Sequence, residues 1–275
     1  MRNWNWRGMW AIVAKDLKQV RQNTMVWTPM VILPILLQVI LPLVMILLPR
    51  MVSDMGSELS DLEPLLAAIP AELLPGIREA SPEVVWVMLT SAYLFAPFFL
   101  LIPMMVTSIL AADSIVGEKE RKTLEGLLYL PLTDQELYLA KTLVSIIPAL
   151  VITLVSFLLY TLVVNAAGYG VVGRVFFPTP LWWPLVFWLA PAVAVAALGA
   201  TVLISSRATT YVQAQQSSGL LVLPVVAWMV SQATGVFIMG PGMMMLVGTL
   251  IWAIGIWLIW LGSKTLSRSR LISQV

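Results

Sequence analysis

The chain has 275 residues, of which 60% are hydrophobic and 11% are charged, and its mean hydropathy is +0.92. A soluble core cannot hide so much apolar surface, so we expect an integral membrane protein with a single membrane domain over residues 1–275. The chain has no cysteine and no histidine, which excludes disulfides, thiolate or imidazole metal sites and catalysis by either residue. We therefore expect a protein that is not an enzyme and holds no cofactor or metal.

Six apolar segments are long enough to cross a membrane. Their apolar runs are continuous rather than alternating, which favours helices over a β-barrel. The predicted fold is all-α, with six transmembrane helices at about residues 26–48, 84–112, 142–166, 182–205, 217–239 and 243–262.

The segment 1–25 is predicted to form an amphipathic helix that lies in the membrane interface on the cytoplasmic side. Its apolar stripe is formed by Trp6, Trp10, Val13 and Leu17, with basic residues on the other side. Residues 49–83 are polar and acidic and are expected to form a loop on the opposite, extracytoplasmic side.

The distribution of basic residues predicts the orientation in the membrane. If segment 1–25, segment 113–141, the connection at Arg207 and the C-terminal tail lie on one side, that side carries 13 of the 16 Lys and Arg residues. Basic residues concentrate in cytoplasmic loops. We therefore expect a multi-pass protein of the cell membrane with both termini in the cytoplasm.

Residues 113–141 form the one long charged segment between two apolar spans. A charged run is followed by leucines at helical spacing, which predicts a short amphipathic helix that ends at Pro131. Thr133 and Glu136 then have the spacing of a capping box, so a second helix is expected to begin at Asp134. Taken alone, the charged run favours a solvated helix face held by weak ion pairs.

The residue order of this segment, D-x-I-x-G-E-K-E-R-x-T-L-E-x-L-L-x-x-P-L-x-x-x-E-L-x-x-x-K, resembles the intracellular coupling loop of type-2 ABC transporter permeases. Elsewhere the resemblance covers only the layout of an N-terminal helix, six spans and a tail. It implies the membrane subunit of an exporter, paired with a second permease copy, identical or paralogous, and driven by a separate ATPase subunit that binds ATP and Mg. The residues implied in ATPase coupling are Gly117, Glu118, Lys119, Glu120, Arg121, Thr123, Leu124, Leu127, Leu128 and Pro131.

The residues themselves also point to a separate motor. The chain lacks a G-x-x-x-x-G-K-[ST] phosphate loop, so it cannot hydrolyse ATP by that means. No span, with the bounds predicted above, contains Asp, Glu, Lys or Arg, which disfavours the alternative of an ion-coupled secondary carrier. A membrane scaffold or assembly factor that recruits a soluble protein through segment 113–141 is a further alternative.

Uncharged spans also bear on the cargo and the partners. Walls of this kind offer nothing to compensate a naked charge, so we expect a substrate with a substantial hydrophobic part. Membrane lipid is an expected partner and nucleic acid is not. A stripe of small residues in the fourth span is expected to pack closely on another helix, and it comprises Ala192, Ala196, Gly199 and Ala200.

Overall fold

The computed structural model describes residues 4–48, 66–67, 69–70, 77–121 and 131–265, and every regular element in these ranges is helical. The first half contains α1 (Trp6–Gln22), α2 (Thr24–Ile35), η1 (Leu36–Ile40), α3 (Leu41–Leu47), η3 (Ile77–Glu79), α6 (Pro82–Met88), η4 (Leu89–Leu94), α7 (Ala96–Phe99), α8 (Leu101–Ala112), η5 (Asp113–Gly117) and α9 (Glu118–Glu120). The second half contains α11 (Asp134–Val172), α12 (Trp182–Pro184), η6 (Leu185–Leu189), α13 (Ala190–Arg207), α14 (Tyr211–Gly219), α15 (Val222–Ala233) and α16 (Pro241–Thr265).

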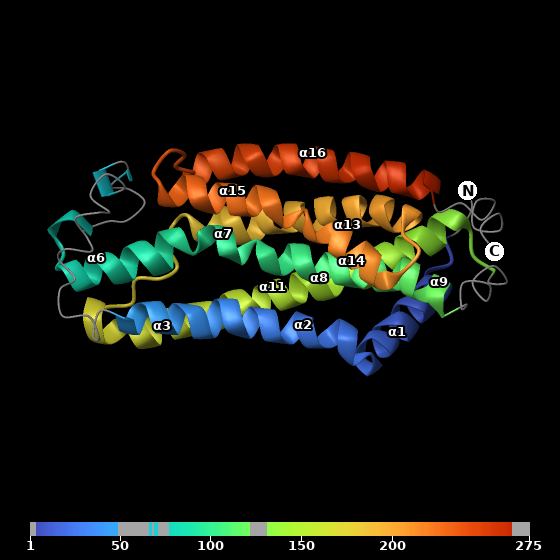
Figure 1. The fold of residues 1–275 in the computed structure, drawn as a ribbon, viewed down its shortest axis with the longest axis horizontal. Coiled ribbons are helices and arrows are strands. Elements are labelled where there is room, and N and C mark those ends of the chain that lie inside the picture. Colours follow the sequence, from blue (N-terminus) through green and yellow to red (C-terminus); the bar gives the residue numbers. More distant parts are fainter. Residues whose placement is uncertain (1–3, 49–65, 68, 71–76, 122–130, 266–275) are drawn as a thin grey trace.

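Five helical stretches in the described ranges are long and apolar enough to cross a membrane, which confirms a multi-pass helical membrane protein. The helices lie side by side along the long axis of the molecule (Figure 1). They are Thr24–Leu47, Pro82–Gly117, Asp134–Val172, Trp182–Arg207 and Pro241–Lys264.

The predicted fifth span, residues 217–239, has a different structure. It is divided between α14 and α15, which are separated at Leu220 and Leu221, and neither helix is long enough to be counted as a span. Pro224 lies in the first turn of α15, where its missing N–H costs no helical hydrogen bond. Because α14 packs on α8 and α15 packs on α7, the pair lies along the bundle between the end of α13 and the start of α16.

Two of the spans are much longer than the sequence predicted. The second continues through the π-helix η5 to Gly117, and the third begins at Asp134. These added turns carry Asp113 and Lys141, and both side chains are buried. The predicted spans are therefore shorter than the helices that contain them, because hydropathy placed the span ends several residues short of the helix ends.

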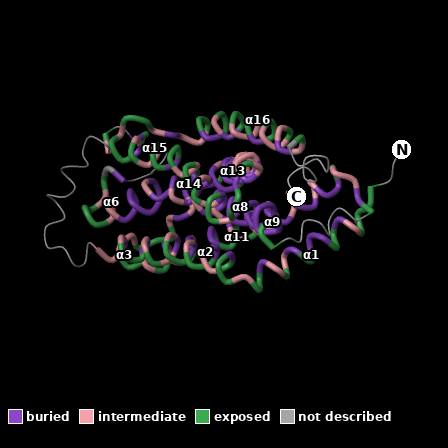
Figure 2. Tube along the Cα trace, turned by 45° about the vertical axis from the view of Figure 1, so that its right-hand side comes forward, coloured by how far each residue is buried: buried purple, intermediate pink, exposed green. Residues whose placement is uncertain are grey.

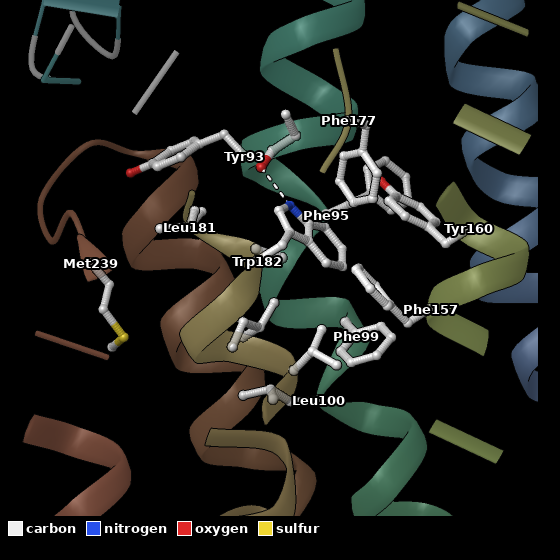
Figure 3. Close-up of a cluster of buried hydrophobic side chains, with 14 of the residues drawn as sticks. Tyr93, Phe95, Phe99, Leu100, Phe157, Tyr160, Phe177, Leu181, Trp182 and Met239 are labelled. Atoms are coloured by element: carbon white, nitrogen blue, oxygen red, sulfur yellow. Dashed lines mark hydrogen bonds between the residues drawn. The ribbon is translucent and has the colours of Figure 1, made fainter. Parts of the chain in front are cut away.

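The stretch Pro82–Gly117 is the most buried of the five and α16 the least (Figure 2). The backbone of Pro82–Gly117 departs from regular α-helix at η4, just before Pro97. Other helices supply hydrogen-bond donors to the carbonyl groups of η4. Trp182 Nε1 donates to Ala92 O at 2.9 Å (Figure 3). In a membrane interior such carbonyls have no water to bind, so these contacts hold the bundle together.

Two further donors act on the same stretch. Tyr160 Oη donates to Ser91 O at 2.6 Å and Gln232 Nε2 donates to Tyr93 O at 2.7 Å. Tyr93 lies four residues before Pro97. Because proline has no backbone N–H, the carbonyl of Tyr93 lacks its usual helical donor. Gln232 thus fixes α15 to the centre of the bundle.

The predicted small-residue stripe of α13 lies partly against α16. A Cβ added at Gly199 would lie 2.6 Å from Leu258 Cβ, and one added at Gly255 would lie 2.8 Å from the backbone N of Ala196. The two helices approach this closely because glycine carries no side chain. Ala192 is buried, whereas Ala200 is only partly buried.

Candidate functional site

The α9 end of the bundle is the end where α1, α9 and the start of α11 come together (Figure 1). Here α1 packs against α11 through a small apolar cluster that includes Met9, Ile12, Leu137 and Val144. Asn5 N donates to Glu136 at 2.9 Å, which ties the start of α1 to the start of α11.

The start of α11 has the predicted geometry. The capping box of Thr133 and Glu136 is present, and the helix begins at Asp134, so this prediction is confirmed.

The residues of the predicted stripe on α1 lie on one side of the helix but differ in exposure. Trp6 and Trp10 are 56% and 52% exposed, whereas Val13 is buried against α11 and Leu17 is partly buried. The buried face also carries Asp16, a carboxylate only 5% exposed. A charge on a buried face requires a partner, and α11 supplies one.

Lys141 of α11 is the centre of a buried ion cluster, which we define as Lys15, Asp16, Glu118 and Lys141. Its ammonium Nζ lies 3.3 Å from Asp16 Oδ2 and 2.5 Å from Glu118 Oε2. Nζ also donates to Ser114 O at 2.9 Å and lies 3.3 Å from Ser114 Oγ. Glu118 is 1% exposed. One ammonium group thus joins residues of α1, η5, α9 and α11.

Lys15 completes the cluster from its outer side. Its Nζ lies 3.3 Å from both Asp16 Oδ1 and Glu118 Oε1, and its side chain is 50% exposed. Burial by itself lowers the pKa of Lys15, but the Asp16 and Glu118 carboxylates outweigh this and raise the pKa above 10.5. Two carboxylates therefore face two ammonium groups, so the cluster is balanced in charge.

Arg121 forms a second ion pair beside the cluster. Its Nη1 lies 3.0 Å from Oδ1 of Asp113, which is 8 residues earlier in the same helical stretch. Gly117 lies between them, and a Cβ added there would lie 2.7 Å from Asp113 Oδ1 and 3.0 Å from Arg121 Nη2. Glycine at this position is what lets the pair close over the backbone.

Glu120 links α9 to α14. Its Oε1 accepts a hydrogen bond from the backbone N of Tyr211 at 3.0 Å, at the first residue of α14. A carboxylate at a helix N-terminus is favoured by the unpaired N–H groups and the helix dipole. At this end of the bundle, α9 is therefore bound to α1, α11 and α14, and it is continuous with α8 through η5.

The comparisons with known proteins give the family. The sequence profile described as ABC-2 family transporter protein matches residues 10–254. The chain belongs to this family. No curated protein and no solved structure gave a match. The ABC-2 family supplies the membrane subunits of ABC transporters, which in general work with an ABC ATPase. This chain is therefore a multi-pass membrane protein and a transport subunit.

In this ABC-2 permease, the predicted coupling residues have different environments. Gly117, Glu118 and Arg121 belong to the contacts just described, and Glu120 is exposed apart from its bond to α14. Lys119 is part of α9, and Pro131 is exposed before α11. The remaining predicted residues, Thr123, Leu124, Leu127 and Leu128, lie outside the described residues, as does most of the predicted amphipathic helix.

The interpretation of the charged run as a solvated face is wrong for Glu118, which is buried and bound to two lysines. Sequence reasoning did not find Asp16, Ser114 or Lys141. The sequence did indicate a buried partner for Asp16, since this residue lies on the same helical face as the apolar residues Ile12 and Val20, where an unpaired carboxylate would be costly. Among the described residues, no group of three or more acidic side chains is placed to hold a metal ion.

Proposed function

We propose that this ABC-2 permease is one half of the membrane part of an exporter, paired with a second permease copy and driven by a separate ATPase that docks on residues 113–141. The ion cluster is the observation that carries this proposal. It binds α9, the short helix within that segment, to α1 and α11 through buried charges. ATP and Mg would be bound by the partner subunit.

The contacts of α9 explain how a push from the ATPase reaches the spans. The helix is continuous with α8 through η5, so a displacement of α9 moves the central span directly. Removing one partner of a buried ion pair costs about 3–5 kcal/mol, so α1 and α11 follow α9 rather than separate from it. Glu120 extends the same link to α14.

The proposed topology has six crossings, with α14 and α15 together as the fifth. The end of α16 lies at the same end of the bundle as α1 and α9 (Figure 1), as expected when both termini are cytoplasmic. The exposed Trp6 and Trp10 are suited to contact lipid headgroups of the plasma membrane from an interfacial α1. The cargo has a hydrophobic part, because the spans between their ends expose apolar side chains.

Site-specific crosslinking tests the docking proposal. A photoreactive crosslinker is attached to single cysteines introduced at Glu120, at the exposed Gln135 and, as a matched control, at Val175, which is 69% exposed in the connection between α11 and α12. The chain has no native cysteine to interfere. We expect an ABC ATPase to be captured from Glu120 and Gln135 and not from Val175.

Capture of a protein that lacks an ATPase site from these two positions would favour a scaffold or assembly factor. Capture of the ATPase only from Val175 would reverse the proposed orientation.

A further inference from the structure

Helix α1 has one exposed side that carries only positive charges. At about 100° per residue, its exposed positions cover roughly half of the helix, and the opposite half packs on α11 and α2. The exposed half carries the basic residues Arg7, Lys15, Lys18 and Arg21. It carries no acidic residue, because Asp16, the one carboxylate of α1, is buried.

Most of this charge has no counterpart in the described structure. Lys15 is bound to the ion cluster, whereas Arg7, Lys18 and Arg21, which we call the basic face of α1, form no ion pair with any described residue. The exposed Ala14 lies among these three on the helix surface, so no bulky side chain shields them. The basic face is therefore suited to an anionic partner from outside the chain.

The position of α1 brings the basic face to the membrane surface. The first span begins at Thr24, so Arg21 lies only three residues before it. Asn23 separates the two helices, and its side-chain oxygen accepts a hydrogen bond from Met25 N at 3.2 Å. At this point α1 turns away from the direction of α2 and is inclined to the spans (Figure 1). The basic face thus extends from the end of a span along the surface of the bilayer.

The exposed Trp6 and Trp10 lie along one edge of the basic face, between it and the side of α1 that packs on α11. Tryptophan is enriched at the membrane–water interface, where its ring contacts the ester region of the lipids. An exposed helix side that combines basic residues with tryptophan is typical of helices that bind anionic bilayers.

We propose that the basic face of α1 binds the phosphate groups of anionic phospholipids, with Trp6 and Trp10 inserted beside the head groups. Basic residues next to a span attract anionic lipids. A lipid fits this surface better than the ATPase does, because the face is continuous with a span and has an aromatic edge. The proposal rests on the proposed function only in assigning the lipid to the cytoplasmic leaflet.

Fluorescence quenching in nanodiscs tests the binding in the full-length permease without the ATPase. A bimane label is attached to a cysteine introduced at Ala14, since the chain has no native cysteine. The nanodiscs contain equal amounts of phosphatidylglycerol and phosphatidylcholine with the same acyl chains, and each lipid in turn carries a nitroxide quencher. We expect stronger quenching by phosphatidylglycerol at Ala14. A label at Val151, exposed on α11 within its span, is the control reporter and should be quenched equally by both lipids.

Neutral variants test which side chains recognise the phosphate. Lys18→Gln and Arg21→Gln should each lower the association of phosphatidylglycerol relative to phosphatidylcholine about fivefold, the change that about 1 kcal/mol per basic side chain represents. Arg207→Gln removes an exposed arginine outside α1 and should leave the ratio at Ala14 unchanged. Because the basic face is exposed, the preference for phosphatidylglycerol should also weaken as the salt concentration rises.

Several results would overturn the proposal. They are equal quenching by the two lipids at Ala14, the same preference at Ala14 and Val151, and a preference that is unchanged in both Lys18→Gln and Arg21→Gln. Sodium phosphate that reduces the preference more than sodium chloride of equal ionic strength would identify a site for soluble phosphate instead. Loss of quenching by both lipids when the ATPase is added would assign the basic face to that partner.

The same experiment keeps this proposal separate from the proposed function. Both leaflets of the nanodisc have the same composition, so a permease with the reverse orientation would give the same quenching. Failure of lipid binding would therefore leave the docking of the ATPase on residues 113–141 to be decided by crosslinking.

Discussion

Replacing Lys141 with Met removes the centre of the ion cluster while keeping the length and apolar stem of the side chain. The ammonium group contacts Asp16, Glu118 and Ser114, and the side chain is only 10% exposed. The two carboxylates would be left with Lys15, which is half exposed, as their remaining ammonium group. Breaking a buried ion pair costs about 3–5 kcal/mol, and the remaining Lys15 favours the lower part of this range.

Thermal unfolding in detergent, followed by the fluorescence of the 12 tryptophans, measures this loss. At about 2–4 °C per kcal/mol for a chain of this size, Tm should fall by about 10 °C. Lys18→Met, on the exposed face of α1, is the matched control and should leave Tm unchanged. Adding Glu118→Gln to Lys141→Met leaves Asp16 paired with Lys15 and should restore part of the loss, with a coupling energy of about 0.5–3 kcal/mol.

Equal Tm values for Lys141→Met and Lys18→Met would refute this reasoning. A double variant that is less stable than the added effects of the two single changes predict would also refute it.

Three further changes test other parts of the structure by the same unfolding assay. Gly117→Ala places a Cβ 2.7 Å from a carboxylate oxygen and should cost about 1–3 kcal/mol, whereas Gly219→Ala, with open space around it, should be neutral or slightly stabilising. Gly199→Ala should force α13 from α16 at a similar cost, and Gly242→Ala in α16 should not; equal effects would contradict the close packing. Because the pKa of Lys15 is raised above 10.5, the stability that its ion pairs add should be fully present at neutral pH and should be lost only as the pH rises beyond that value. A Tm difference between wild type and Lys15→Met that vanishes near pH 7 would be inconsistent with these ion pairs.

The parts of the fold that could be predicted are those set by neighbouring residues. Apolar runs located the five spans of sufficient length, and the capping box of Thr133 and Glu136 fixed the start of α11. Each of these signals is formed by residues that are close together in the sequence. The break between α14 and α15 could have been suspected from Gly219, which follows the mostly polar residues 213–218, and from Pro224, which interrupts the apolar run after it.

The ion cluster could not be predicted in the same way, because its members are far apart in the chain. Lys141 lies 125 residues from Asp16 and 23 residues from Glu118. Only the packing of α1 on α11 shows that these charges meet. As a result, charge reversal at Glu118 is expected to disturb the fold rather than coupling alone, and the exposed Glu120 is the better probe of docking.

The central claim, that the ion cluster transmits motion from the ATPase to the spans, is tested most directly by pulsed electron paramagnetic resonance. A spin label at Val175, remote from the cluster, reports the distance between two permease copies in the reconstituted complex, first with ADP and then with ATP and vanadate. We predict that the distance distribution shifts in the otherwise unchanged permease. In the Glu118→Gln, Lys141→Met double variant, which keeps its charge balance, we predict that the ATPase still binds but the shift is lost. The same shift in both proteins would contradict the claim.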